Sequence, residues 1–208
     1  MWNTNDYQID IVLIRHGQVP GNLEKRFVGI TDESLTEEGR EAIANRQYPE
    51  ADMLFVSPLK RCAETANIIY PGLEPISVEE FSEIKFGAFE GKNDEELKDN
   101  VEYQEWIKSG RKKPFPGGES VTRFMLRVTR GMSSVLHMAI DEIESSGKKD
   151  KKITLAAVVH GGTIMAIQAY LGLSSFYDKM YDNAEYRCIG VDVKHDTTHD
   201  CITMQLRR

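Results

Sequence analysis

Apolar residues along the chain fall into two kinds of pattern, one typical of buried strands and one typical of helices. Short apolar runs rich in β-branched residues predict strands buried on both faces, and they cover residues 9–14, 53–56 and 153–159. Apolar positions at helical spacing predict helices over residues 36–46, 59–70 and 120–146. Strands that alternate with helices predict a three-layer α/β/α fold, in which helices cover both faces of a mostly parallel central sheet.

Two regions depart from this alternation. Residues 79–119 carry many glycines and prolines around one expected helical stretch, residues 94–108, and this pattern predicts a flap beside the sheet. Near the C-terminus, residues 187–193 and 201–206 alternate between apolar and polar. We expect these two segments to pair as a hairpin at the sheet edge, with the turn at residues 196–198.

The composition is that of an ordinary soluble globular protein, with 40% hydrophobic and 28% charged residues. A chain of 208 residues is expected to form one domain, residues 1–208, with the flap as an insertion. The formal net charge of −7 argues against nucleic acid or an anionic membrane as a partner. No stretch approaches the roughly 20 apolar residues of a membrane helix, and a signal peptide pattern is absent. The 3 cysteines indicate neither a disulfide framework nor a zinc site, so a cytoplasmic protein is expected.

Polar residues stand directly after each predicted buried strand. Arg15 and His16 follow the first strand, Arg61 comes shortly after the second, and His160 follows the third. The carboxyl ends of parallel strands form the ligand crevice of an open α/β sheet, so we expect these four side chains to face one crevice. Two cations and two imidazoles in one place predict a site that holds an oxyanion next to a nucleophile.

Each residue type suits a phosphate ester for a physical reason. An arginine binds phosphoryl oxygens with two parallel hydrogen bonds and stays charged at every relevant pH. Neighbouring cations lower the pKa of a histidine, which leaves a neutral imidazole nitrogen available for attack. Gly161 and Gly162 are expected to open a helix whose backbone N–H groups and dipole point at an anion.

Several short motifs in this order resemble those of the histidine phosphatase superfamily, over nearly the whole chain. They are R-H-G-x(4)-N-x(3)-R-x(2)-G at 15–29, S-P-L-x-R-C at 57–62, E-x(3)-G-x(2)-E-G at 83–91, P-G-G-E-S at 116–120 and V-H-G-G at 159–162. The resemblance implies the phosphoglycerate mutase-like fold and an enzyme that forms a phosphohistidine. It implies no metal and no organic cofactor.

The resemblance also implies roles for individual residues. His16 would be the nucleophile, and Arg15, Arg61 and His160 would hold the phosphoryl group. Glu83 would be the acid that protonates the leaving group and then the base that activates water, with Glu90 as the competing assignment. The expected substrate-binding residues are Asn22, Gly29 and Gly161.

The segment after Glu83 bears on whether water or a second hydroxyl accepts the phosphoryl group. Phosphoglycerate mutases carry E-R-H-Y-G here, whereas this chain reads E-I-K-F-G, which favours a phosphatase. The pattern is most similar to broad-specificity and α-ribazole phosphatases, so the expected partner is a small phosphorylated metabolite such as α-ribazole phosphate. Two alternatives are a phosphoglycerate mutase and a catalytically inactive module that binds phosphate esters. Val19 and Val28 depart from the usual hydroxyl residues of the first motif.

Overall fold

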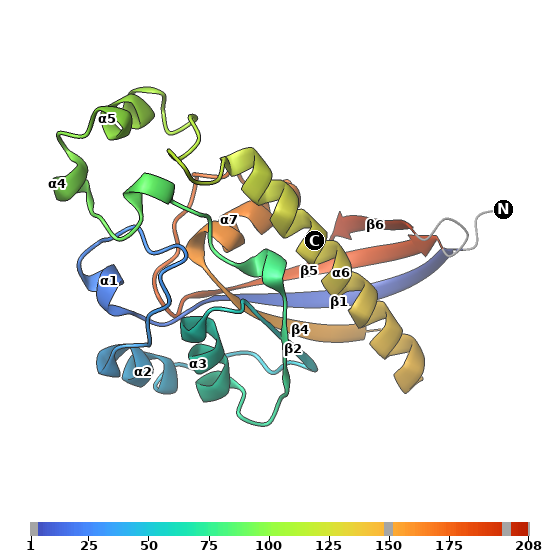
Figure 1. Ribbon diagram of the computed structural model, residues 1–208. Helices are drawn as coiled ribbons and strands as arrows, with labels where there is room; N and C mark the ends of the chain where they lie inside the picture. The colour runs from blue at the N-terminus through green and yellow to red at the C-terminus, as the bar shows by residue number, and fades with distance from the viewer. Residues whose placement is uncertain (1–3, 148–151, 197–200, 208) are drawn as a thin grey trace.

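The computed structural model describes residues 4–147, 152–196 and 201–207, and a six-stranded sheet lies at its centre (Figure 1). The strands are β1 (Thr4–Arg15), β2 (Met53–Val56), β3 (Pro75–Ser77), β4 (Lys152–Val159), β5 (Tyr186–Asp196) and β6 (Cys201–Leu206). Their order is β3-β2-β4-β1-β5-β6. The strands β1 to β4 run parallel, whereas β5 and β6 are antiparallel to their neighbours. The predicted mostly parallel α/β sheet is confirmed.

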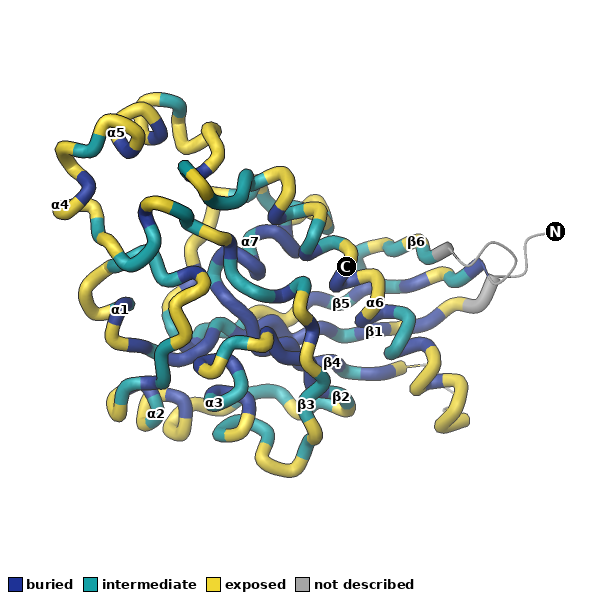
Figure 2. Tube along the Cα trace, viewed as in Figure 1, coloured by how far each residue is buried: buried dark blue, intermediate teal, exposed yellow. Residues whose placement is uncertain are grey.

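Helices cover both faces of this sheet. They are α1 (Pro20–Leu23), α2 (Glu37–Ala44), α3 (Lys60–Ile69), α4 (Asp94–Leu97), α5 (Val101–Lys108), α6 (Val121–Ser146) and α7 (Gly161–Tyr170), with short 3-10 helices η1 (Glu79–Phe81) and η2 (Gly87–Phe89). Side chains alternate between the two faces of β1. Ile9, Ile11 and Leu13 belong to the core cluster that contains α6 and α7, whereas Val12 and Ile14 pack with α3. Figure 2 shows the buried strands between these layers.

The long helices begin and end at local signals in the sequence. The Thr36 hydroxyl accepts the N–H of Gly39 at 3.0 Å and caps α2. Ser120 caps α6 in the same way, by accepting the N–H of Arg123 at 3.3 Å. The helix α6 ends at Gly147, which has a φ of 65° that glycine adopts without strain. The helices expected over 36–46, 59–70 and 120–146 are therefore present, with shorter ends.

Residues 94–108 of the flap form two short helices, α4 and α5, where the sequence predicted one. The Asn100 side chain accepts a hydrogen bond from the N–H of Tyr103 at 2.9 Å. It therefore caps the N-terminus of α5 and separates this helix from α4. Aromatic rings of the flap pack against one another and around Phe27, which lies outside the flap; the flap rings are Phe86, Phe89, Tyr103, Trp106 and Phe115. The flap stands at the carboxyl ends of the parallel strands (Figure 1).

The edges of the sheet differ from the prediction in one place. The sequence did not indicate β3, because three residues that begin with proline carry too little pattern, and the strand forms by pairing with β2. The expected C-terminal hairpin is present as β5 and β6, although residues 197–200 of its turn lie outside the described residues. In the described part of the chain, no helix has both the length and the apolar character needed to cross a membrane.

The register of the parallel strands determines where the predicted site residues meet. Arg15 at the end of β1 pairs with Val159 at the end of β4, and Val56 at the end of β2 pairs with Val158. The N–H of His16 continues the ladder to the carbonyl oxygen of Val159 at 2.9 Å. The residues that follow β1, β2 and β4 therefore lie side by side.

Candidate active site

The two histidines that follow β1 and β4 lie next to each other at this end of the sheet. The ring centroids of His16 and His160 are 5.2 Å apart. Arg61, in the first turn of α3, donates from Nε to Nδ1 of His160 at 3.3 Å. All three side chains are buried. The structure thus brings these three predicted residues together from three separate parts of the sequence.

His16 presents a neutral imidazole in a defined tautomer. Its Nδ1 lies 2.7 Å from the carbonyl oxygen of Gly17, which only accepts, so Nδ1 carries the proton and Nε2 keeps the lone pair. Burial, followed by the charges of Arg61 and Arg15, holds the pKa of His16 well below its usual range. A neutral imidazole with a free Nε2 is the form of histidine that can attack an electrophile.

His160 and Arg61 are buried beside His16 and do not line the cavity. Nε2 of His160 is 2.7 Å from the Ser57 hydroxyl, and the Arg61 guanidinium donates to carbonyl oxygens of residues 28–31 at 2.7 to 3.3 Å. The sequence led us to expect both side chains in contact with the phosphoryl group, whereas their polar atoms here bind other parts of the protein. The charge of Arg61 still acts on His16, because it helps to lower the pKa of that imidazole.

Arg15, unlike Arg61, lines the cavity. It donates from Nη1 to the carbonyl oxygen of Tyr181, while its buried Nε makes no hydrogen bond within the described structure. Burial lowers the pKa of Arg15 from its usual value, and Glu83 opposes this effect. Gly161 lies beside the same side chain, since an added Cβ would be 3.6 Å from Arg15 Nε. A buried N–H without a partner at a cavity wall is suited to bind an anionic ligand.

Glu83 comes from the loop after η1 and lies at the start of α7. Its carboxylate accepts the N–H of Ile84 at 2.9 Å and that of Gly162 at 3.1 Å. Burial raises the pKa of Glu83 from its usual value, although these two hydrogen bonds and the charges of Arg61 and Arg15 partly oppose the shift. The Gly162 N–H, which we expected to point at a bound anion, therefore binds Glu83 in this structure.

Glu90, the competing candidate for the acid, lies outside the cavity. Its Oε1 accepts hydrogen bonds from the N–H groups of Gly29 and Thr31, at 2.8 and 3.0 Å, and from the Thr31 hydroxyl. Gly29 is likewise not among the lining residues, and its carbonyl oxygen accepts from Arg61. Glu90 and Gly29 together hold the 28–31 loop in place, so the geometry favours Glu83 as the residue that meets a ligand.

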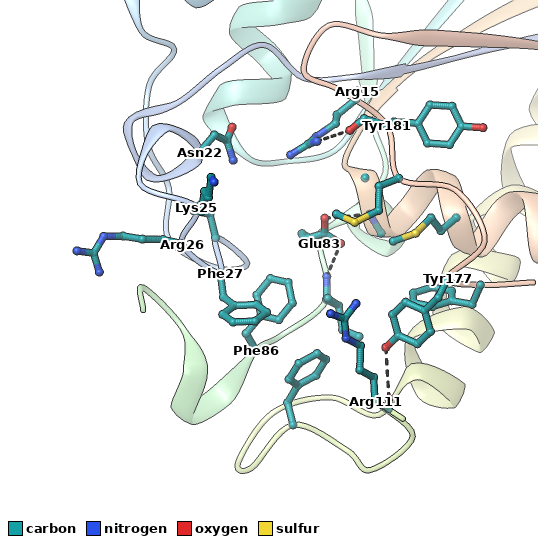
Figure 3. Close-up of a pocket in the computed structure, with 18 of the residues that line it drawn as sticks. Arg15, Asn22, Lys25, Arg26, Phe27, Glu83, Phe86, Arg111, Tyr177 and Tyr181 are labelled. Atoms are coloured by element: carbon teal, nitrogen blue, oxygen red, sulfur yellow. Dashed lines mark hydrogen bonds between the residues drawn. The ribbon is translucent and has the colours of Figure 1, made fainter. Parts of the chain in front are cut away.

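A cavity of about 470 Å³ is lined by His16 and by several residues of the flap, and Figure 3 shows part of its lining. Its polar end contains Arg15, Asn22 and Glu83. Arg111 reaches in from the loop after α5, beside Phe86 and Tyr177 in the figure, and its guanidinium carbon lies 5.6 Å from the centroid of the Trp106 ring. Most of the wall is apolar and is formed by Phe27, Val28, Phe86, Tyr103, Trp106, Phe115, Met165, Phe176, Tyr177 and Met180.

Two residues near the site were not identified from the sequence. Asn183 and Tyr181, from the loop before β5, line the cavity, and they contact His16 and Arg15 at the end of β1. Nothing in the local pattern marks them, because a loop asparagine or tyrosine most often has only a turn or packing role. Val19, one of the departures from the usual motif, is fully buried in a cluster with Leu35 and Ile43, so it has a packing role.

The model of the histidine phosphatase superfamily (branch 1) matches residues 11–199. The chain belongs to the histidine phosphatase superfamily. It is an enzyme of the histidine phosphatase type, with a phosphatase or mutase-like reaction. Among the described residues of this histidine phosphatase, no group of three or more His, Cys, Asp or Glu side chains is placed to hold a metal ion.

Relatives of this histidine phosphatase carry both kinds of name. It is 28% identical over 199 residues to phosphoserine phosphatase 1 of Hydrogenobacter thermophilus, covering 90% of this chain and 89% of the relative. It is 32% identical over 198 residues to 2,3-bisphosphoglycerate-dependent phosphoglycerate mutase 2 of Gloeobacter violaceus, covering 89% and 85%. The crystal structure of the alpha-ribazole phosphatase from Shigella flexneri has the same fold, with a TM-score of 0.68, 20% identity and 95% of each chain covered.

Proposed function

We propose that this protein hydrolyses small phosphomonoesters through a phosphohistidine at His16. The observation that carries the proposal is the state of this imidazole. It is neutral, its Nδ1 is protonated, and it lies between the charges of Arg15 and Arg61. It opens onto a cavity that also holds the carboxyl group of Glu83, whose pKa is raised by burial. A nucleophile, a cation and an acid around one cavity support phosphoryl transfer.

In the first step, Nε2 of His16 attacks phosphorus, and a P–N bond forms as the P–O bond to the leaving group breaks. The raised pKa of Glu83 keeps its carboxyl group protonated to higher pH than usual, so it can give its proton to the departing oxygen. Arg15 balances negative charge on the phosphoryl oxygens, where its unpartnered Nε is available. The alcohol then leaves the cavity.

In the second step, the Glu83 carboxylate takes a proton from a water molecule whose oxygen attacks phosphorus. The P–N bond breaks, the electron pair returns to Nε2 of His16, and inorganic phosphate is released. Glu83 ends the cycle protonated, so both residues are regenerated. Because this route uses only protein side chains and water, we propose that it needs neither a metal ion nor an organic cofactor.

The lining of the cavity favours a substrate whose leaving group contains a ring. A volume of about 470 Å³ suits a metabolite, and the wall offers the faces of Phe86 and Tyr177 on both sides of Arg111. The buried Nε1 of Trp106 makes no hydrogen bond within the described structure, so an acceptor on the ligand would satisfy it. α-Ribazole phosphate is one ester of this class. We also propose a cytoplasmic location, which suits the free thiols of Cys62 and Cys188.

A mutase is the second candidate, because several relatives at 29 to 33% identity are named 2,3-bisphosphoglycerate-dependent phosphoglycerate mutases. Phe86 favours hydrolysis. It stands where those enzymes carry a tyrosine, and its ring packs 5.1 Å from Phe27 and 5.0 Å from Phe115 as part of an apolar wall. At this position the chain offers a phenyl ring without a hydroxyl, which suits a ring of the substrate better than a small, highly charged substrate.

The test is a phosphate-release assay with p-nitrophenyl phosphate, phenyl phosphate, α-ribazole phosphate, glycerol phosphate, phosphoserine and 3-phosphoglycerate, with and without EDTA. We expect release that resists EDTA, is faster for esters with a ring and disappears in His16→Ala. Rapid acid quenching should trap acid-labile phosphate on the wild-type chain and none on the variant. Absence of release from every ester contradicts the hydrolase. Conversion of 3-phosphoglycerate to 2-phosphoglycerate that depends on 2,3-bisphosphoglycerate would favour the mutase.

A further inference from the structure

Asn183 contacts two parts of the proposed site, and the mechanism above gives it no role. Its Nδ2 lies 3.2 Å from the carbonyl oxygen of His16, 3.3 Å from that of Gly17 and 2.9 Å from Oδ1 of Asn22. Carbonyl oxygens only accept hydrogen bonds, so the orientation of the Asn183 amide is determined by its surroundings. One side-chain NH₂ group therefore joins the segment that carries His16 and Gly17 to α1, the helix that carries Asn22.

The backbone around Asn183 is held firmly against the end of β1. The N–H of Ala184 lies 3.1 Å from the carbonyl oxygen of Arg15, and the carbonyl oxygen of Ala184 accepts from Arg46 at 2.7 Å and from Tyr48 at 3.0 Å. Ala184 has a φ of 62°, which turns the chain sharply after Asn183. The Asn183 side chain thus starts from a fixed position and can hold its neighbours in place.

The contact with Asn22 determines which atom that residue offers to a ligand. Oδ1 of Asn22 accepts from the N–H of Val19 at 3.2 Å and from Asn183 at 2.9 Å, so both of its lone pairs are used. The remaining polar atom of Asn22, its Nδ2, is a donor, and Asn22 lines the cavity close to Arg15 (Figure 3). A donor in this position stabilises phosphoryl oxygens, whereas a flipped amide would present an oxygen and repel them.

The contact with Gly17 acts on the nucleophile. The Gly17 carbonyl oxygen accepts from Nδ1 of His16 at 2.7 Å, and the Gly17 N–H donates to the Thr65 hydroxyl at 2.9 Å. Asn183 binds the same carbonyl oxygen and so helps to keep this peptide in the orientation that places the His16 proton on Nδ1. The nitrogen that faces the cavity then keeps its lone pair.

We propose that Asn183 is a positioning residue for phosphoryl transfer, which holds the Asn22 amide with its NH₂ toward the phosphoryl oxygens and the Gly17 carbonyl on Nδ1 of His16. The inference rests on the proposed function, because it assigns Asn183 to the same reaction. It acts through two neighbours and needs no contact of its own with the substrate.

The test uses Asn183→Asp, which keeps the shape of the side chain and removes both hydrogens. The new carboxylate faces three oxygen atoms, so the Asn22 amide is expected to flip and donate to it. We expect kcat/KM for p-nitrophenyl phosphate to fall by about 100-fold in Asn183→Asp and by about tenfold in Asn183→Ala, the range that lost buried hydrogen bonds produce. Asn45→Asp, the same exchange at an exposed position, is the matched control and should retain wild-type kinetics.

Two readouts separate positioning from a loss of folding. In an Asn22→Ala background the effect of Asn183→Asp should shrink to about tenfold, because no amide is left to flip. The charged groups beside His16 are Arg15 and Arg61, with a neutral His160. An added carboxylate nearby favours the protonated imidazole, so the acid limb of the pH–rate profile should move to higher pH in Asn183→Asp and stay in place in Asn183→Ala.

The outcomes distinguish this inference from the proposed function. A wild-type protein that releases no phosphate from any ester contradicts the proposed function itself. Wild-type hydrolysis together with wild-type kinetics in Asn183→Asp overturns the positioning role. Equal losses with and without Asn22 overturn the part of the inference that concerns the amide. If Asn183→Asp does not fold, Asn183→Ala alone and combined with Asn22→Ala decides the question in the same way.

Discussion

Two adjacent glycines at the start of α7 allow a sharp test of the role of Glu83. A Cβ added at Gly162 would lie 2.3 Å from Oε1 of Glu83 and 3.1 Å from its carboxyl carbon. A Cβ added at Gly161 would meet its nearest atom, Nε of Arg15, only at 3.6 Å. Gly162→Ala must therefore displace the Glu83 carboxyl group, whereas Gly161→Ala fits into the existing space.

The size of the expected effect follows from this geometry. Ordinary contact begins at 3.4 Å, so Oε1 must move by about 1 Å. This movement disturbs the hydrogen bond that Oε1 accepts from the N–H of Ile84 and the one that Oε2 accepts from the N–H of Gly162. A displacement of about 1 Å at a reacting group costs about 100-fold in rate, and complete loss of a general acid costs about 10²- to 10⁴-fold. We expect kcat/KM for glycerol phosphate to fall at least 100-fold in Gly162→Ala and by a clearly smaller factor in Gly161→Ala, whose methyl group lies beside Arg15 and not against Glu83.

The assay compares two leaving groups. Glycerol leaves as an unstable alkoxide and needs the proton from Glu83, whereas p-nitrophenolate leaves as a stable anion and needs it much less. The loss in Gly162→Ala should therefore be much smaller with p-nitrophenyl phosphate. Thermal unfolding serves as a control, because both substitutions remove a helix glycine and change stability by at most about 0.5–1 kcal/mol if the clash is relieved. Equal losses for both esters, or equal losses in both variants, would refute the assignment of Glu83 as the acid.

Three further predictions concern pH and stability. The pH–rate profile should be bell-shaped, because activity falls at low pH as His16 is protonated and at high pH as Glu83 loses its proton. Arg61→Gln removes a charge that lowers the pKa of His16, so the acid limb of the variant should move to higher pH. An unchanged acid limb contradicts this effect of Arg61. His16 and His160 are buried with lowered pKa values, so below about pH 6.5 the unfolded chain binds more protons than the folded protein. The free energy of unfolding, measured in urea, should therefore decrease as the pH falls below that value. A constant free energy of unfolding between pH 7 and 5.5 speaks against buried neutral histidines. Phe81→Ala removes a fully buried ring and should cost about 3–5 kcal/mol of unfolding free energy, whereas Leu126→Ala, at 55% exposure, should cost less than about 0.5 kcal/mol.

Local sequence patterns predicted much of the fold because the signals are strong. The apolar runs at 53–56 and 153–159 coincide with β2 and β4, and the helix over 120–146 coincides with α6, which starts after Ser120 and ends at Gly147. Weak or short signals failed. The pattern over 94–108 did not show the break that Asn100 introduces, and three residues were too few to indicate β3.

For the site, the sequence predicted which residues come close together but not where their side chains point. The rule that ligands bind at the carboxyl ends of parallel strands placed His16, His160 and Arg61 near one another, and the structure has them within contact distance. The direction of each side chain was not predictable. Arg61 turns toward the 28–31 loop, and Arg15 faces the cavity, because the available carbonyl acceptors come from loops distant in sequence.

The sequence by itself determined the alternation of strands and helices and the family, since both depend on residue types at short and regular spacing. Only the tertiary structure decided that Glu83, and not Glu90, lines the cavity and that Asn183 joins the segment of His16 to α1. The burial, charges and hydrogen bonds of these residues depend on contacts between residues that lie more than 60 positions apart in the sequence. Such contacts exist only once the sheet has brought the strand ends together.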